Sequence, residues 1–405
     1  MSNLGFMEKL LDGIEVEWLS FGEIATIQRG ASPRPIASYI TDDENGVPWI
    51  KIGDTSTGSK YVNGTAQKIT NEGAKKSRIL KKGDFILSNS MSFGRPYILN
   101  ICGAIHDGWA SISDFGDKLD SDYLYHFLSS HNVQNYWLSK INSGSVSNLN
   151  ADLIKTLQIP IPCPEVPDKS LAIQRKIVEV LDTFTELTTE LTTELSARKK
   201  QYNYYRDQLL SFEEGEVEWK TLGDLAENLD SKRKPITSGL REPGDTPYYG
   251  ASGIVDYVKD YIFDEDLLLV SEDGANLLAR NTPIAFSISG KTWVNNHAHV
   301  LKFETYAERR YVEFYLNSID LTPYISGAAQ PKLNKRNLNG IRIPNPSPEE
   351  KVKIVATLDK FHALTSSRKE GLPREIELRQ KQYEYYRDLL LSFPKPEIEE
   401  GVSHG

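Results

Sequence analysis

The chain has 405 residues, of which 39% are hydrophobic and 25% are charged, and its formal net charge is −9. This length is typical of more than one domain, and the composition is typical of a folded globular protein. No run approaches the ~20 apolar residues that a transmembrane helix needs. Two cysteines, Cys102 and Cys163, exclude a disulfide framework. We therefore expect a cytoplasmic protein with reduced thiols, no membrane segment and no metal site.

The first predicted elements are a helical stub over residues 1–14 and a globular domain over residues 15–167. The domain starts at a Glu-Val-Glu-Trp motif (15–18) and ends in a proline-rich segment (159–167). Short apolar runs such as 84–88, bounded by turn residues, predict short strands with a few helices between them. The expected fold class is α+β (mixed α/β). The proline-rich segment is expected to be a stiff hinge, because proline disfavours helix.

A long helix is predicted next, over residues 168–214. Its apolar residues recur every three or four positions from Ile173 to Phe212, with one step of seven and no Gly or Pro between them. This spacing, about 3.5 residues, indicates a helix that buries a narrow seam against a second helix. In its middle stands a tandem Thr-Thr-Glu-Leu repeat, which consists of Thr188, Thr189, Glu190, Leu191, Thr192, Thr193, Glu194 and Leu195. We expect this repeat to set the spacing between two domains.

A second α+β domain is predicted over residues 215–346, followed by a second long helix over 347–393 and a flexible tail over 394–405. A capping box with proline at the first helical position starts that helix at Ser347. The Gly-Leu-Pro sequence at 371–373 interrupts the helical pattern, so we expect a break there.

The two halves of the chain repeat one plan, although the interiors of the two domains do not match each other. The Glu-Val-Glu-Trp motif returns at 216–219, and the Ile-Pro-x-Pro motif returns at 343–346. Residues 198–212 return at 379–393 with three differences. Such a repeat predicts a pseudo-two-fold, cyclic arrangement with two unlike globular domains and two long helices.

With these repeated motifs the sequence resembles the specificity subunit of type I restriction-modification systems. It is most similar to the IC-type subclass, whose central helix carries tandem four-residue repeats. The resemblance covers nearly the whole chain. It implies two target-recognition domains that each bind one half of a split, asymmetric site on double-stranded DNA. It also implies that the two long helices pack antiparallel as a coiled coil, which fixes the spacer. As partners it implies two modification subunits, which methylate adenine, and restriction subunits, which cleave and translocate DNA.

The resemblance also implies that this chain has no catalytic residue and binds no cofactor. S-adenosylmethionine, ATP and magnesium are expected to be used by the partner subunits.

Polar and basic loops are the predicted DNA contacts, because Lys and Arg neutralise phosphates while Ser, Asn, Gln and Arg bond to base edges. The candidates in the first domain are Lys75, Lys76, Arg78, Ser90, Ser92, Arg95, Ser143 and Ser145. The candidates in the second domain are Lys232, Arg233, Asn276, Asn296, Gln330, Lys332 and Lys335. The alternative for the loop at 88–95 is a tight turn with Arg95 in an internal ion pair, and the alternative for the basic runs at 75–82 and 232–234 is a solvated face. Because both domains are near neutral, the positive charge must be local or come from a partner protein.

Aromatic residues mark the repeated helix ends, namely Tyr202, Tyr205, Phe212, Tyr383, Tyr386 and Phe393. Their helical spacing and their duplication favour packing against a helix or a partner subunit over stacking on bases. His297 and His299 are not expected to bind a metal, because no third ligand is near them in the sequence.

Catalytic alternatives are poorly supported by the sequence. A methyltransferase needs a Gly-rich cofactor loop and an Asn/Asp-Pro-Pro-aromatic motif, and the Asn-Pro-Ser-Pro sequence at 345–348 lacks the second consecutive proline and the aromatic residue. A nuclease needs clustered carboxylates with a lysine, and the Glu-Trp-Lys at 218–220 has no lysine in its counterpart at 17–19. A non-DNA scaffold with two binding modules on a coiled-coil spacer stays open as the alternative. Salt-dependent binding of duplex DNA would distinguish it.

Overall fold

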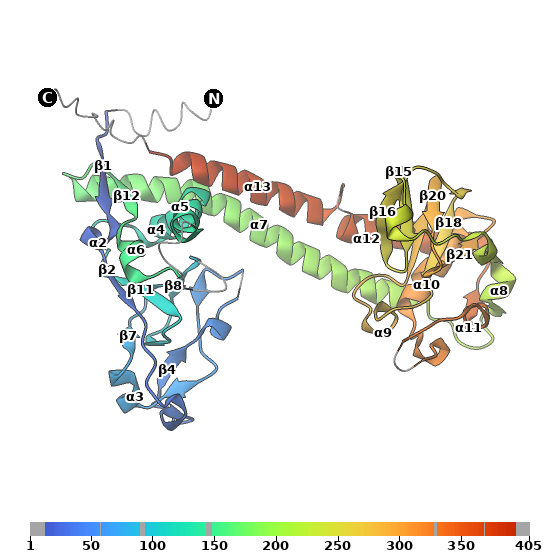
Figure 1. Ribbon diagram of the computed structural model, residues 1–405, viewed down its shortest axis with the longest axis horizontal. Coiled ribbons are helices and arrows are strands. Elements are labelled where there is room, and N and C mark those ends of the chain that lie inside the picture. The colour runs from blue at the N-terminus through green and yellow to red at the C-terminus, as the bar shows by residue number, and fades with distance from the viewer. Residues whose placement is uncertain are drawn as a thin grey trace. The chain divides into compact units, whose positions relative to one another are not determined.

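The computed structural model describes residues 13–56, 58–89, 94–142, 148–327, 330–367 and 369–393. The chain forms two compact units: unit 1 comprises Met1–Glu190 and Ile376–Gly405, and unit 2 comprises Leu191–Glu375. The division falls inside one continuous helix, α7 (Pro167–Leu209), and each unit contains one α+β domain (Figure 1). The fold class expected from the sequence is thereby confirmed. The predicted tail and all but the last two residues of the predicted stub lie outside the described residues.

Unit 1 contains, in its described part, two sheets of five strands, in the orders β3-β6-β4-β10-β7 and β2-β11-β8-β9-β5. The strands are β2 (Thr26–Arg29), β3 (Ile40–Thr41), β4 (Val47–Ile50), β5 (Tyr61–Val62), β6 (Lys68–Ile69), β7 (Arg78–Leu80), β8 (Phe85–Ser88), β9 (Pro96–Leu99), β10 (Gly103–Ile105) and β11 (Trp109–Ser113). The helices are α2 (Phe21–Ile24), α3 (Asn71–Lys75), α4 (Ser121–Leu128), α5 (His131–Asn142) and α6 (Ala151–Lys155). Strand β8 lies in the middle of its sheet and is buried throughout, which explains its uninterrupted apolar run.

Unit 2 contains, over the residues described there, two sheets of four strands, in the orders β14-β21-β18-β19 and β16-β15-β20-β17. The strands are β14 (Glu227–Asn228), β15 (Pro243–Gly250), β16 (Gly253–Val258), β17 (Phe263–Asp264), β18 (Leu267–Ser271), β19 (Ala285–Ile288), β20 (Lys291–Val294) and β21 (Ala298–Lys302). The helices are α8 (Leu222–Leu225), α9 (Asn276–Ala279), α10 (Tyr306–Ser318) and α11 (Lys335–Asn339).

The two domains share one strand topology, although the sequences of their interiors do not match. In each domain a buried strand has antiparallel partners on both sides: β8 pairs with β11 and β9, and β18 pairs with β21 and β19. The other sheet contains one parallel pair, β4 with β10 or β15 with β20. After the buried strand the same backbone bond recurs. The N–H of Asn89 donates to the carbonyl of Gly108 (3.0 Å), and that of Glu272 donates to the carbonyl of His297 (2.9 Å).

Each proline-rich segment begins as a strand, so the expectation that the whole segment is a hinge is wrong. β12 (Gln158–Pro162) pairs antiparallel with β1 (Val16–Ser20), and β22 (Arg342–Asn345) pairs antiparallel with β13 (Glu218–Thr221). Proline is tolerated because each ladder has two strands, and a residue whose N–H side faces away from the partner loses no ladder bond. The two repeated motifs of each half therefore bond to each other at the base of each domain.

The long helices differ in continuity. α7 has 43 residues, which at 1.5 Å per residue is about 65 Å. The C-terminal helical region is divided into α12 (Pro348–Ser366) and α13 (Leu372–Leu390). Ser347 caps α12, since its hydroxyl accepts a bond from the N–H of Glu350 (3.2 Å). Within the ranges searched, no helix is long and apolar enough to cross a membrane.

Aromatic stacking pairs the helices in each unit. In unit 1, Phe184 of α7 stacks on Tyr386 of α13 with ring centroids 5.0 Å apart. In unit 2, Tyr205 of α7 stacks on Phe361 of α12 at 5.6 Å. Phe184 precedes Tyr205 in the sequence, whereas its partner Tyr386 follows Phe361, so α7 runs antiparallel to α12 and α13. The apolar seam predicts the helical partner, and the antiparallel direction is the one that the resemblance implies.

Candidate nucleic-acid interface

The second domain brings four loops together, and we call them the second-domain loop cluster. The loops are residues 229–234, 272–276 and 295–297, together with the described residues 326–327 and 330–333. The N–H of Leu333 donates to the carbonyl of Glu272 (2.8 Å), whose own N–H bonds to His297. The guanidinium of Arg233 donates to the carbonyl of Ala298 (2.8 Å). Candidate residues that are far apart in the sequence therefore share one surface.

A buried ionic network underlies this cluster. Arg233 Nη1 lies 2.6 Å from Glu272 Oε2, His299 Nδ1 lies 2.6 Å from Asp230 Oδ2, and Lys332 Nζ lies 3.1 Å from Glu272 Oε1. Burial alone would raise the pKa of both carboxyl groups. The hydrogen bond from Arg233 to Glu272 and that from His299 to Asp230, together with the nearby positive charges, lower both pKa values below the ordinary range. Both carboxylates are therefore ionised at neutral pH.

The acidic side chains of the second-domain loop cluster are paired with other residues of the domain, whereas its lysines are exposed at the surface. Of its three acidic side chains, two belong to the ionic network, and the third, Asp273, lies 2.9 Å from His297 Nδ1. The lysines point outward instead: Lys232 and Lys234 are exposed, and the side chain of Lys332 is 52% exposed. An acidic protein thus presents lysines locally, which is the charge distribution that phosphate binding requires.

Arg233 is placed differently from both sequence interpretations, a phosphate clamp and a solvated face. Its side chain is 14% exposed and bonded inside the domain. Asp230, Glu272 and His299 also bring three ligand-type atoms within 4.8 Å of one another, a grouping that the sequence did not reveal. Both ring nitrogens of His299 are hydrogen-bonded, and Arg233 bonds to Glu272. The chain's own cations therefore supply the charge that a metal would bring, and we interpret the group as an ion-pair network.

The remaining second-domain candidates differ in accessibility. Asn296, Gln330 and Lys335 are exposed, the first two in the cluster and the third at the start of α11. The side-chain amide of Asn276 accepts from the N–H and donates to the carbonyl of Thr282, at 3.0 Å each. Asn276 thus closes its own loop, whereas the other three can meet a ligand without rearrangement. Their roles as DNA contacts stay predictions.

The first domain carries an equivalent group of cations and hydroxyls around Asp107. Ser32 Oγ donates to Asp107 Oδ1 (2.8 Å), His106 Nε2 lies 3.1 Å from Oδ1, and Arg34 Nη2 lies 3.8 Å from Oδ2. Arg29 Nε donates to the Asp107 carbonyl (3.3 Å). Burial would raise the pKa of Asp107, but the Ser32 hydroxyl, His106 and Arg29 lower it. The side chain of Arg34 is 86% exposed, so a pair at this distance leaves it available to a phosphate.

These first-domain residues were missed by the sequence reasoning. No motif marks them, and they meet because β2 and β11 are paired. Knowledge of that strand pairing is the signal that would have found them.

The predicted basic residues Lys75, Lys76 and Arg78 lie near the group around Asp107. Lys75 and Arg78 are exposed, whereas Lys76 Nζ donates to the hydroxyl of Tyr39 (2.5 Å). Arg78 of β7 pairs with Ile105 of β10, the residue before His106. The run and the loop at 106–108 therefore lie at the same end of one sheet.

Arg95 faces the long helices of unit 1 instead of an open loop. Its guanidinium lies over the ring of Tyr97, 5.8 Å from the centroid. It lines a pocket of about 330 Å³ together with Gln134, Gln380 and Arg387. Ser90, Ser92, Ser143 and Ser145 lie outside the described residues and stay predictions.

The aromatic residues of the repeated helix ends pack within their own units. Tyr383 is 7% exposed, and its hydroxyl lies 2.9 Å from Nδ1 of the buried His126. Phe393 is 5% exposed and contacts Tyr123 edge-on. Tyr202 and Phe212 lie against the core of unit 2. These rings are engaged in packing and do not form an open stacking platform.

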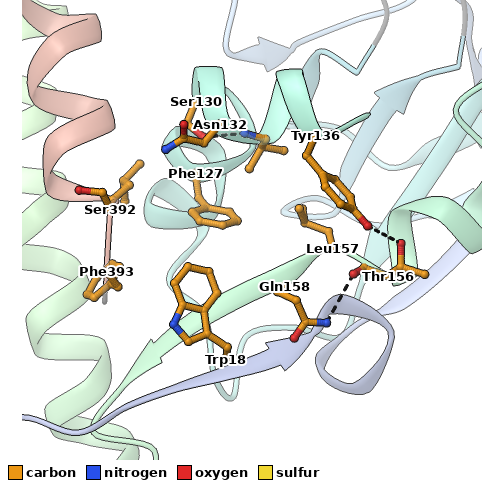
Figure 2. Close-up of a pocket in the computed structure, with 12 residues that line it drawn as sticks. Trp18, Phe127, Ser130, Asn132, Tyr136, Thr156, Leu157, Gln158, Ser392 and Phe393 are labelled. Atoms are coloured by element: carbon orange, nitrogen blue, oxygen red, sulfur yellow. Dashed lines mark hydrogen bonds between the residues drawn. The ribbon is translucent and has the colours of Figure 1, made fainter. Parts of the chain in front are cut away.

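An uncharged pocket of about 450 Å³ lies elsewhere in unit 1 (Figure 2). Trp18 and Phe127 line it between β1, α4 and β12, and Phe393 closes one side. The hydroxyls of Tyr136 and Thr156 bond to each other at its rim (2.9 Å). With no charged side chain in its lining, the pocket is not suited to phosphate.

Comparison with known proteins gives one family. Residues 14–199 and 214–378 match the family model described as type I restriction modification DNA specificity domain. The specificity subunit of the Escherichia coli type I restriction enzymes EcoR124I/EcoR124II is 36% identical, over 98% of this chain and 99% of its own length. The Escherichia coli EcoprrI specificity subunit is 32% identical, over 91% and 92%.

Two solved structures share the fold. The S subunit of a type I restriction-modification system from M. genitalium has a TM-score of 0.54 at 15% identity, over 95% of this chain and 98% of its own. A chain from a structure of type I restriction-modification complex assembly has a TM-score of 0.62 at 15% identity, over 93% and 97%.

Proposed function

The chain belongs to the type I restriction-modification DNA specificity family, and from this membership we propose how its two domains bind DNA. Proteins of this family recognise a bipartite DNA target and assemble the complex, and they are not catalysts. We assign one half of the split site to each domain, with the loop cluster of the second domain and the Asp107 group of the first as the DNA-facing surfaces.

One observation carries this assignment. In the second-domain loop cluster Asp230 and Glu272 are paired with Arg233 and Asp273 lies beside His297, while Lys232, Lys234 and Lys332 are exposed, as are the amides of Asn296 and Gln330. Lysines position a duplex through its phosphates, and amides distinguish base edges. A surface with both groups has the chemistry of sequence recognition.

The partner subunits and the spacer belong to the same proposal. The chain would assemble in the cytoplasm with two modification subunits, which use S-adenosylmethionine to methylate adenine, and with restriction subunits, which use ATP and magnesium. The continuous helix α7 would set the number of unrecognised base pairs between the half-sites. Its length of about 65 Å is close to two helical turns of DNA, each roughly 34–36 Å.

Charge reversal tests the DNA-facing surface. The double variant Lys232→Glu with Lys332→Glu, assembled with the modification subunits, should bind the target duplex more weakly. The slope of log affinity against log salt concentration should decrease in magnitude by about one for each phosphate that no longer has a lysine beside it. The matched control is Lys259→Glu, an exposed lysine of the same domain that comes directly after β16 and pairs with Glu242. It should change neither quantity.

Two outcomes would contradict the proposal. Unchanged affinity and salt slope in a folded double variant would contradict the placement of the surface. A wild-type complex that binds no duplex at any salt concentration would favour the non-DNA scaffold.

A further inference from the structure

We propose that the buried His299 is a positioning residue that holds the DNA-facing residues 330–333 in register. This inference rests on the proposed function, because it assigns these residues a role in recognising the second half-site. His299 does not touch DNA in this proposal. It acts through Leu333, next to the exposed Lys332 and three residues beyond Gln330.

Two hydrogen bonds fix the ring of His299. The residue is fully buried in β21. Its Nδ1 lies 2.6 Å from Asp230 Oδ2, and its Nε2 lies 2.7 Å from the carbonyl oxygen of Leu333. A backbone carbonyl can only accept, so Nε2 donates to Leu333. The ring therefore bridges the segment that carries Asp230 and the loop that ends at Leu333.

Backbone hydrogen bonds hold the two ends of the loop together and attach them to the domain. The N–H of Ser326 donates to the carbonyl of Lys332, and the N–H of Lys332 donates back to Ser326, both at 2.8 Å. These two bonds close the loop on itself. Leu333 attaches it to the rest of the domain by the bond from His299 and by the backbone bond to Glu272, and the carbonyl of Pro331 accepts a longer bond from the N–H of Gly274 (3.3 Å). A shift at this attachment would move every base-facing side chain of the loop.

Charged groups surround the His299 ring. Asp230 faces Nδ1 directly, and Glu272 Oε2 lies 3.8 Å from the same nitrogen. Arg233, which pairs with both carboxylates, and Lys332, which pairs with Glu272, balance the two negative charges. Asp230 Oδ2 also accepts from Asn228 Nδ2 (3.2 Å), so loss of the ring is felt mainly at the carbonyl of Leu333, which would lose the donor that ties it to β21.

The first domain shows that the fold itself does not need a histidine at this position. The shared register makes Ala110 of β11 the counterpart of His299: Ala110 pairs with Leu87 in β8 as His299 pairs with Val270 in β18. Ala110 is 1% exposed, and the corresponding strand pairs form around it. The histidine bridge is therefore specific to the second domain, where it holds Leu333.

The test measures discrimination at each half-site separately. The half-sites are first mapped from methylated adenines, and the chain is assembled with its modification subunits. Affinity is then measured for duplexes that carry one base-pair change in either half. For wild type a change costs a factor of about 5 to 150 in either half. His299→Gln should reduce this factor to near one in a single half and leave the other half unchanged.

A matched control separates positioning from general damage. His126→Gln removes an equally buried histidine that also bonds to a carboxylate, Asp182, but it lies at the contact of α4 with α7. It should not change discrimination in the half affected by His299→Gln. Asp230→Asn is the second variant. It keeps the shape of the partner and removes its charge, and it should cause a smaller loss in the same half.

The results distinguish a failure of the role of His299 from a failure of the proposed function. Equal loss at both halves, or full discrimination by folded His299→Gln or Asp230→Asn, would overturn the role of His299. A wild-type complex with no preference at either half would instead contradict the proposed function.

Discussion

Deleting one Thr-Thr-Glu-Leu unit, residues 192–195, should shorten the spacer of the recognised site and leave both half-sites unchanged. Four residues fewer shorten α7 by about 6 Å and rotate the C-terminal part of this helix by about 40° beyond a full turn. Because base pairs are spaced by about 3.4 Å, the expected change is one or two base pairs. None of the four side chains is buried, so the deletion removes no core residue. The leucines of the repeat are four positions apart, so the remaining unit continues the same face of the helix.

The assay is single-molecule sequencing of methylated adenines in cells that express the deleted chain with its modification partner. A control in which Thr192→Ala and Thr193→Ala keep the length should leave the spacer unchanged. An altered half-site with an unaltered gap would refute the reasoning, as would a changed spacer in the length-matched control.

Three further changes have definite expectations. Gly327→Ala should weaken duplex binding and lower the thermal midpoint, because Gly327 has φ +84° and an added Cβ would lie 2.4 Å from the carbonyl oxygen of Gln330. Unchanged affinity of the folded variant would show that this loop does not touch the duplex. The hydrogen bond from His126 lowers the pKa of Asp182, so this carboxylate stabilises the fold above its unfolded pKa of about 3.9 and the stabilisation is lost as the pH falls through the lower folded pKa. Acid titrations followed by circular dichroism should show a smaller loss of stability for Asp182→Asn than for wild type, and identical curves would exclude this linkage. Leu358→Ala, at a fully buried position of unit 2, should cost about 2–5 kcal/mol in denaturant unfolding, and a loss well below that range would mean that the site collapses without a cavity.

The architecture was predictable because its signals are local in the sequence. The apolar seam from Ile173 onward requires one long helix with a helical partner, and the repeated motifs require two copies of one plan. Both expectations are confirmed in the structure. The hinge interpretation failed because proline excludes helix but does not exclude an edge strand, as the pairing of Trp18 with Pro160 shows.

The candidate interface was less predictable, because strand register brings its parts together. His299 meets Asp230 and Leu333 only after β21 has paired with β14 and β18, and nothing near His299 in the sequence indicates either contact. Arg233 shows the same limit. A basic run in the sequence does not reveal that its middle member is bonded to a carboxylate 39 residues away.

The antiparallel ladders β1–β12 and β13–β22 place the entry and the exit of each domain on adjacent strands. A chain that leaves and rejoins its support at neighbouring points can be replaced as a cassette, since any insert with closely spaced ends fits the same attachment. Recombination with crossovers inside the two repeated motifs would therefore supply new binding surfaces while the coiled-coil frame stays intact. The divergence of the two interiors, beside nearly identical helix ends, is compatible with such exchange.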